Sequence, residues 1–401
     1  MVVNSVSNSQ SSVEARRRLA YFNERRDEMV ATIRELVEIE SPSDNKAAVD
    51  RVAEAIAHKF SQLGGNVEVH VHPAKDSGNH LQVEFDSPGK PAAKPVLLLG
   101  HYDTVYPLGT LATMPCRVVD NTLTGPGVLD MKSGIALMLH ALAALQEWHK
   151  EQLQGALPRP VTVLLVSDEE VGSDSSLAIT ESLAKKAAAV LVLEPSYGLQ
   201  GAVKTARKGV GEYLVKVTGK ASHAGLDFQK GVNAILELAR QIEKVSSFTD
   251  LKKGLTVNVG VVSGGSRTNV VPAEAAAQID VRIARLKDAA GIDKKMRGRR
   301  PYNRKCKIEI TGGINRPPME RTAGVAALYE QAAAIARELG WKLGEAAVGG
   351  GSDGNFTASL GIPTLDGLGA VGDGAHAPHE HILISELPRR AALLAGLIEG
   401  V

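Results

Sequence analysis

Three consecutive acidic residues stand directly after an apolar run of the chain. Residues 163–167 read Val-Leu-Leu-Val-Ser, and Asp168, Glu169 and Glu170 follow them, with a glycine at position 172. The apolar run predicts a strand buried on both faces. Three carboxylates at its end would repel one another and raise each other's pKa, and a bound cation would relieve that repulsion. One of the adjacent glutamates could then hold the metal while the other acts as a base. By itself, the trio is equally typical of a solvated acidic loop.

Other metal-type side chains follow two further apolar runs. Residues 95–100 and 189–193 also predict buried strands, and they are followed by His101 and Glu194. Ligand sites in open α/β sheets lie outside the carboxyl ends of the strands, so these side chains should gather at one edge. The chain adds Asp130, in a glycine-rich turn before a predicted helix, and a late cluster at 376–381 that reads His-Ala-Pro-His-Glu-His. Histidine and carboxylate together suit zinc, cobalt or manganese.

The elements that would position these residues predict an α/β fold with an insert. We expect a mixed, largely parallel sheet flanked by helices, because buried strands alternate with helical stretches. Residues 13–40 predict one helix that Pro42 ends, and Asn45 can cap the next. From position 209 the order becomes β-α-β-β-α-β, which is typical of a ferredoxin-like unit. The expected domains are 1–206 and 314–401, forming a discontinuous catalytic domain, and 207–313, forming an inserted lid or dimerisation domain.

Composition limits the class of protein and its partners. The chain has 401 residues, 44% hydrophobic content and a net charge of +1, which is ordinary for a globular protein and predicts no nucleic-acid partner. Cys116 and Cys306 are far apart and lack zinc-finger spacing, so free thiols in a reducing compartment are expected. The first twelve residues do not resemble a secretory signal, and no apolar run reaches membrane-spanning length. These features predict a cytoplasmic protein with no membrane partner.

The motifs together resemble a family of dinuclear zinc exopeptidases and amidohydrolases. This family includes glutamate carboxypeptidase, acetylornithine deacetylase and succinyl-diaminopimelate desuccinylase, and the pattern is most similar to glutamate carboxypeptidase. The similar stretches keep the family's order over nearly the whole chain, at positions 100–105, 125–134, 167–172, 193–195, 219–225, 268–272 and 376–380. Each stretch is weak alone, whereas the ordered set is a strong signal.

The resemblance implies a role for each matching residue. Two zinc ions per subunit are expected, with cobalt or manganese possible, and the implied ligands are His101 and Glu194 for one ion, Glu170 and His376 for the other, and Asp130 between them. Glu169 would be the general base and Asp103 would orient His101. His379 stands where the family has a short polar or acidic residue, so it competes with His376 as a ligand. We favour His376 because His-x-x-x-Glu matches the family's spacing.

The resemblance also implies residues that bind the substrate. His223 would donate a hydrogen bond to the tetrahedral oxyanion, reaching the site across a dimer interface of the inserted domain. Asn269, Arg282 and Arg316 are similar to residues that hold a substrate carboxylate, and the arginine fork suits that task. Without the resemblance, a turn histidine and ordinary surface arginines would explain these positions.

The expected function is zinc-dependent hydrolysis of an amide bond next to a free C-terminal carboxylate, in a small peptide or an N-acyl amino acid. The first alternative is an N-acyl amino acid deacylase, which uses the same chemistry with a different acyl pocket. A non-catalytic binding protein with this fold is disfavoured by the complete set of site residues. A nucleotide-binding protein is disfavoured because Gly125-Pro126-Gly127 lacks the third glycine, with Asp130 in its place.

Overall fold

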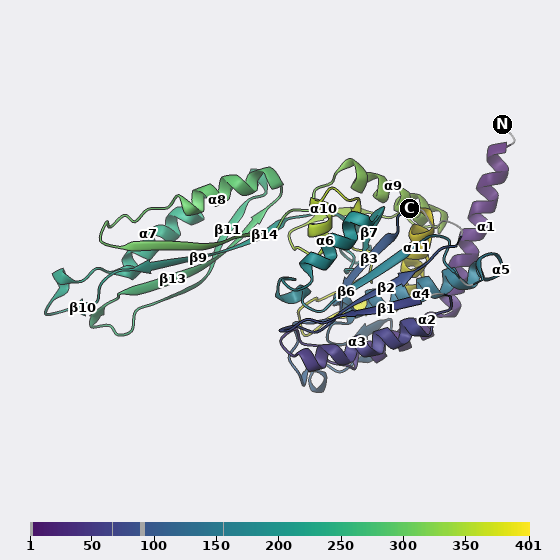
Figure 1. Ribbon diagram of the computed structural model, residues 1–401, viewed down its shortest axis with the longest axis horizontal. Coiled ribbons are helices and arrows are strands. Elements are labelled where there is room, and N and C mark those ends of the chain that lie inside the picture. The colour runs from purple at the N-terminus through teal and green to yellow at the C-terminus, as the bar shows by residue number, and fades with distance from the viewer. Residues whose placement is uncertain (1–2, 66, 89–92, 155) are drawn as a thin grey trace. The chain divides into compact units, whose positions relative to one another are not determined.

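The computed structural model describes residues 3–65, 67–88, 93–154 and 156–401 (Figure 1). The chain divides into two compact units. The first unit comprises Met1–Thr205, Arg321–Ala347 and Ser352–Val401, and the second comprises Ala206–Glu320 and Val348–Gly351. The second unit thus begins near the expected position 207 and continues past the expected end at 313, because strand β14 (Lys307–Arg316) runs through that position.

A six-stranded sheet forms the centre of the first unit. Its order is β1-β2-β6-β3-β7-β16, with bounds β1 (Val67–His72), β2 (His80–Phe85), β6 (Val161–Val166), β3 (Val96–His101), β7 (Ala189–Val192) and β16 (Thr364–Leu365). The pairs β6–β3, β3–β7 and β7–β16 are parallel, whereas β1 and β2 join in antiparallel orientation. The predicted mixed, largely parallel sheet is confirmed, and β16 shows that the C-terminal segment rejoins it. Strands β3, β6 and β7 are buried along their whole length.

Helices cover both faces of this sheet. Alternate residues of β3 and β6, such as Leu98 and Val163, belong to a large core with helices from both ends of the chain, and their neighbours Leu99 and Leu164 pack against α6. The helices are α1 (Val3–Glu24), α2 (Arg26–Val37), α3 (Lys46–Ser61), α4 (Ser133–Trp148), α5 (Lys150–Leu153), α6 (Leu177–Lys186), α9 (Ala323–Glu338), α10 (Gly354–Ser359) and α11 (Leu387–Gly400). Asn45 caps α3 as expected, since its side chain accepts a hydrogen bond from the amide of Ala48.

The expected single helix over 13–40 is wrong. The chain forms α1 and α2 with a break at Arg25, whose backbone is not helical. The two helices pack on different neighbours, α1 mainly on α11 and α2 mainly on α4. A straight helix could not bury both apolar faces, so tertiary packing decides the break.

The expectation that no apolar stretch is long enough to span a membrane is also wrong. Val128–Trp148 is 21 residues long and sufficiently apolar by length and composition. In this structure 83% of the most apolar 18-residue stretch of this segment is buried, and α4 packs against α11 and α2. A core helix that is surrounded on all sides becomes apolar all round, which explains the resemblance to a membrane span.

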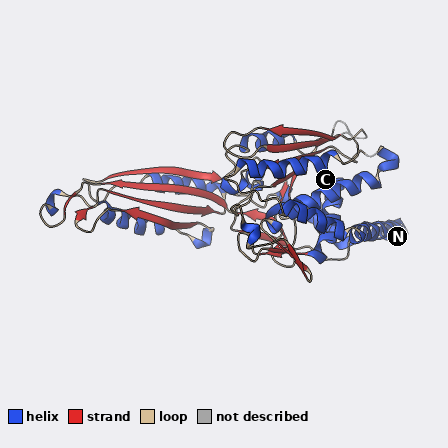
Figure 2. Ribbon diagram, turned by 90° about the horizontal axis from the view of Figure 1, so that it is seen from below, coloured by secondary structure: helices blue, strands red, loops and turns tan. Residues whose placement is uncertain are grey.

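The second unit contains a four-stranded antiparallel sheet with order β11-β13-β9-β14. Its elements are β9 (Gly209–Thr218), α7 (Ala234–Ser246), β11 (Thr256–Gly264), β13 (Glu274–Ile283), α8 (Ala289–Arg297) and β14, which is the predicted ferredoxin-like succession. Both helices contribute to one core with the inward residues of the sheet. Figure 2 draws these helices in blue and the strands in red. Short strands β10 (Ser222–His223) and β12 (Val270–Val271) pair beside this sheet.

The remaining strands form two small sheets. One has the order β17-β18-β5-β4, with β17 (Gly372–Asp373), β18 (His381–Leu383), β5 (Thr122–Thr124) and β4 (Arg117–Val119). Strands β4 and β5 form a hairpin that turns at Asp120-Asn121. The other sheet pairs β8 (Val203–Arg207) with β15 (Glu345–Val348). Pairing of β18 with β5 brings the segment after His376 beside the segment that leads to Asp130.

Candidate metal centre

The first group of potential metal ligands consists of His101, Asp130 and Glu194. His101 is the last residue of β3, and Glu194 follows β7, so the parallel register of the two strands places both side chains at one edge. The Nε2 atom of His101 lies 3.1 Å from Oδ1 of Asp130 and 3.5 Å from Oε1 of Glu194. His101 and Glu194 are buried. In this group, the side chains that follow β3 and β7 lie together at one edge of the sheet, as the sequence predicts.

The second group consists of Asp130, Glu170 and His376. Glu170 lies in the one-turn helix η3 (Glu169–Val171) that follows β6. The Nε2 atom of His376 lies 3.1 Å from Oε1 of Glu170 and 3.5 Å from Oδ2 of Asp130. Asp130 therefore presents Oδ1 to the first group and Oδ2 to the second, which is the arrangement required of a carboxylate shared by two metal ions.

Asp103 connects His101 to the loop that carries the two glutamates. Its buried carboxylate accepts hydrogen bonds from the amides of Glu169 and Glu170, at 3.3 and 3.2 Å, and from the Ser43 hydroxyl at 2.7 Å. Nδ1 of His101 lies 3.1 Å from the main-chain oxygen of Asp103 and 3.4 Å from its Oδ1. Asp103 thus positions both a histidine and the acidic turn. Ser43 has no distinguishing sequence signal, because its role depends on a contact across sixty residues of chain.

The backbone of His376 has an unusual conformation. His376 has a φ of 62°, in the left-handed region that is unusual for a residue other than glycine. Such a conformation costs of the order of 1–3 kcal/mol and persists where the surroundings hold it, commonly at functional sites. His379 belongs to neither ligand group among the described residues, whereas His376 belongs to the second. The structure therefore brings His376 rather than His379 to Asp130 and Glu170.

The charges of the two groups fit bound cations. Burial lowers the pKa of His101, but hydrogen bonds with Asp103, Asp130 and Glu194 outweigh it and raise the pKa well above the usual value. Hydrogen bonds with Asp130 and Glu170 raise the pKa of His376 to about 10. Burial raises the pKa of Glu170. A cluster of this kind requires positive charge between its carboxylates, and a divalent cation supplies that charge while the imidazoles act as neutral ligands.

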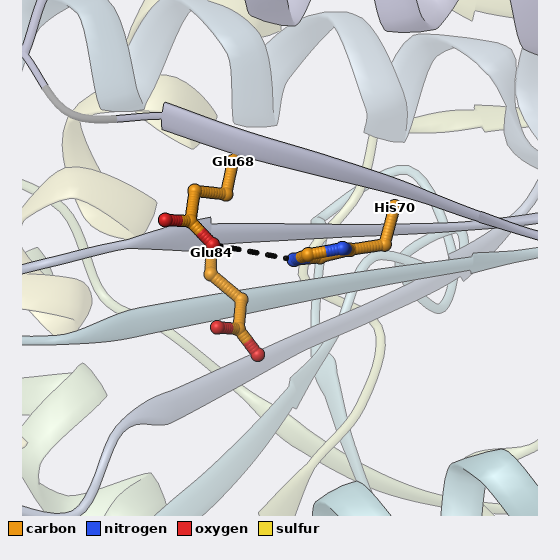
Figure 3. A group of neighbouring side chains, drawn as sticks. All are labelled: Glu68, His70 and Glu84. Atoms are coloured by element: carbon orange, nitrogen blue, oxygen red, sulfur yellow. Dashed lines mark ion pairs between the residues drawn. The ribbon is translucent and has the colours of Figure 1, made fainter.

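A third group of potential ligands lies on the β1–β2 hairpin. Figure 3 shows Glu68, His70 and Glu84, with Nε2 of His70 3.5 Å from Oε2 of Glu68. The antiparallel register places Glu68 directly opposite Glu84. The side chains of Glu68 and His70 are 70% and 46% exposed, and no buried carboxylate orients His70 within the described ranges. The group therefore has the character of a solvated strand face, unlike the two groups that share Asp130.

The expected substrate-binding residues belong to the second unit. The main chain brings His223 and Asn269 together, because β10 pairs with β12 and the Ala224 amide donates to the Asn269 carbonyl at 2.9 Å. Nδ1 of His223 accepts hydrogen bonds from two main-chain amides, at 3.1 and 3.0 Å, so the ring proton resides on Nε2. His223 is exposed.

Arg282 and Arg316 lie at the other end of the same sheet. Both are paired with Val210 of β9, from opposite sides. At about 3.3 Å per residue, β9 extends roughly 26 Å from Val210 to Thr218, and His223 follows beyond Thr218. Arg282 forms an ion pair with Asp280 at 2.8 Å. One copy of the second unit therefore does not assemble Asn269, Arg282 and Arg316 into a single carboxylate clamp.

Known proteins are similar to this chain in both sequence and fold. Residues 97–400 match peptidase family M20/M25/M40. The chain is 32% identical to carboxypeptidase G2 from Pseudomonas sp. (strain RS-16) over 376 residues, covering 92% of this chain and 88% of that protein.

The solved structures that share the fold include two bacterial peptidases. The aminopeptidase PepT from Bacillus cereus superposes with a TM-score of 0.72 at 23% identity, covering 93% of this chain and 98% of that one. A dinuclear metal binding peptidase from Bacillus subtilis superposes with a TM-score of 0.66 at 14% identity, covering 94% and 98%. The family match extends over three quarters of the chain and includes both ligand groups. The chain is therefore a member of peptidase family M20/M25/M40, a metallopeptidase of that family.

Proposed function

We propose that this peptidase hydrolyses the amide bond next to a free C-terminal carboxylate, in a small peptide or an N-acyl amino acid. The observation that carries the proposal is the position of Asp130, which offers one oxygen to each of two ligand groups. Similarity to carboxypeptidase G2 over most of the chain supports the carboxypeptidase specificity.

Five side chains would hold two metal ions, zinc by preference with cobalt or manganese as alternatives. His101 and Glu194 would bind one ion, Glu170 and His376 the other, and Asp130 both. When bound, the ions would supply Lewis acidity toward the scissile carbonyl and lower the pKa of the attacking water. The burial of His101, Glu194 and Asp103 keeps bulk water away from the inner side of the centre.

Glu169 would act as the general base and then as the acid. It adjoins Glu170 in the η3 turn but belongs to neither ligand group among the described residues. The turn would thus give two adjacent carboxylates different tasks, because Asp103 accepts hydrogen bonds from both of their amides and Glu170 lies against His376. Glu169 would take a proton from the water and deliver it to the leaving nitrogen, which contributes about 10²–10⁴-fold to the rate.

The second unit would contribute the groups that bind the substrate. The Nε2 proton of His223 makes it a hydrogen-bond donor for a developing oxyanion. Because His223 and Asn269 lie far from Arg282 and Arg316 along β9, we propose a homodimer through this unit. In that dimer, one copy would supply the His223 end and the other the arginine end of a site.

The test compares Glu169→Gln with Glu170→Gln in purified, zinc-loaded protein. Glu169→Gln should lower kcat by at least a hundredfold and keep two zinc ions per chain, whereas Glu170→Gln should lose zinc as well as activity. Metal content is measured by elemental analysis, and hydrolysis is measured on peptidyl-glutamates and N-acetyl amino acids. Full activity of Glu169→Gln would refute its role as the base. Preference for the acetylated compounds would establish the deacylase alternative instead.

A further inference from the structure

Glu380 is a fully buried carboxylate beside the metal centre, where its charge also attracts that of the buried Lys132. Its Oε1 atom accepts hydrogen bonds from the amides of Leu129 and Asp130, at 2.7 and 2.9 Å. Its Oε2 atom accepts one from the amide of Gly127 at 3.0 Å. Burial raises the pKa of Glu380, while the hydrogen bonds from these three amides favour the ionised form. Three main-chain donors thus converge on one side chain.

The location of Glu380 connects segments that carry different metal ligands. Glu380 lies four residues after His376, and the amides that it binds belong to the turn that carries Asp130. Tyr106, from the segment that begins with His101, donates its hydroxyl to the Ala377 carbonyl at 3.1 Å. The side chain of Glu380 therefore joins the second group's histidine to the carboxylate that both groups share.

The hydrogen bonds at position 380 require a carboxylate side chain. Transfer of a charged group into the interior is unfavourable unless several donors compensate it, and amide donors to a carboxylate form strong, short hydrogen bonds. Glutamine has nearly the same shape but only one acceptor oxygen. Its NH₂ group would face the amide of Gly127 or the amides of Leu129 and Asp130, so at least one amide would lose its acceptor. The turn would then be free to shift relative to His376.

We propose that Glu380 is a positioning residue that fixes the shared carboxylate of Asp130 relative to His376, and thereby sets the affinity of the centre for its second metal ion. This inference rests on the proposed two-metal function. Glu380 contacts neither metal nor substrate in this account. It acts through the backbone of residues 127–130.

The experiment measures zinc affinity directly, without turnover. Metal-free wild-type protein and Glu380→Gln are titrated with zinc in competition with a chromophoric chelator, which resolves the two binding steps. Thermal unfolding of each metal-free protein is recorded in parallel. The matched control is Glu237→Gln, because Glu237 is 2% exposed and accepts hydrogen bonds from the amides of Tyr302 and Asn303, at 2.9 and 2.8 Å. Its partners all belong to the second unit, so it tests the loss of a buried carboxylate alone.

Glu380→Gln should weaken at least one zinc-binding step by about 10–100-fold, which is the usual effect of altering a group that orients metal ligands. Glu237→Gln should bind zinc as wild type does, even where its unfolding temperature falls. Wild-type zinc affinity in Glu380→Gln would overturn the proposal.

Two further outcomes remain decisive. If Glu380→Gln does not fold, Glu380→Asp replaces it, since the shorter side chain cannot reach all three amides from the same backbone position. Wild-type affinity in Glu380→Asp would overturn the proposal too. Wild-type protein that binds fewer than two zinc ions would refute the two-metal function itself, so the two failures are distinguishable.

Discussion

His140 should make the first unit sensitive to acid. This residue lies in α4, and its Nε2 atom is 3.0 Å from Oγ1 of Thr32 on α2. Burial lowers the pKa of His140 from 6.5 to about 4, with Lys59 and Arg25 adding to the effect. Above pH 6.5 the ring is neutral in both the folded and the unfolded chain. As the pH falls below 6.5, the unfolded chain binds a proton that the folded chain excludes, so stability decreases until about pH 4.

The magnitude follows from the two pKa values. The pKa values of about 4 in the folded chain and 6.5 in the unfolded chain, at about 1.4 kcal/mol per pH unit, correspond to about 3 kcal/mol of unfolding free energy. This amount is lost completely once the pH is below about 4. At pH 5.0 the loss due to this ring is about 2 kcal/mol relative to pH 7.5. His140→Gln is uncharged at every pH, so it should lack that part of the acid-induced loss.

The assay is urea unfolding of both proteins at pH 7.5 and 5.0 in the presence of a chelator. Tryptophan fluorescence reports the relevant unit, because Trp148 and Trp341, the two tryptophans of the chain, both belong to the first unit. The chelator removes metal-dependent stability, and the other titrating groups contribute equally to both proteins. A change in unfolding free energy with pH that is the same in both, within about 0.5 kcal/mol, would refute the reasoning.

Three further predictions concern the first unit, whose stability is measured with the same fluorescence assay. Gly134→Ala should lower the free energy of unfolding by about 1–3 kcal/mol and weaken zinc binding. The reason is that the new Cβ would lie 2.1 Å from the Leu193 carbonyl oxygen, next to Glu194. Arg390→Met should lower the free energy of unfolding by about 3–5 kcal/mol. The buried guanidinium donates to three main-chain carbonyl oxygens, and these would lose their donors. Removal of metal by a chelator should abolish hydrolysis and lower the unfolding temperature of the first unit, and zinc at a hundredfold over its Kd should restore about 2.7 kcal/mol.

Each of these predictions has a result that contradicts it. Wild-type zinc affinity in Gly134→Ala would show that the strand end tolerates the added methyl group. An unfolding free energy of Arg390→Met within 1 kcal/mol of wild type would mean that the carbonyl oxygens find other donors. Undiminished hydrolysis after dialysis against a chelator, confirmed metal-free by elemental analysis, would contradict the metal-dependent mechanism.

Sequence alone determined the elements whose signal is local. The buried strands ending in His101, the acidic trio and Glu194 were predictable, because uninterrupted apolar runs and the residues after them are short-range patterns. The Asn45 cap and the ferredoxin-like order were predictable for the same reason. The prediction that the strand-end ligands share an edge needed only the geometry of parallel strands.

Tertiary structure alone decided which side chains meet over long distances in the chain. Glu380 was visible in the sequence only as a spacing from His376, whereas its contacts with the turn before Asp130 depend on the pairing of β18 with β5. The break at Arg25 depends on which helices α1 and α2 pack against. The separation of His223 from the arginines depends on the register of β9, which motif matching does not contain. Contacts of this kind arise from the packing of whole elements, and a local pattern carries no information about them.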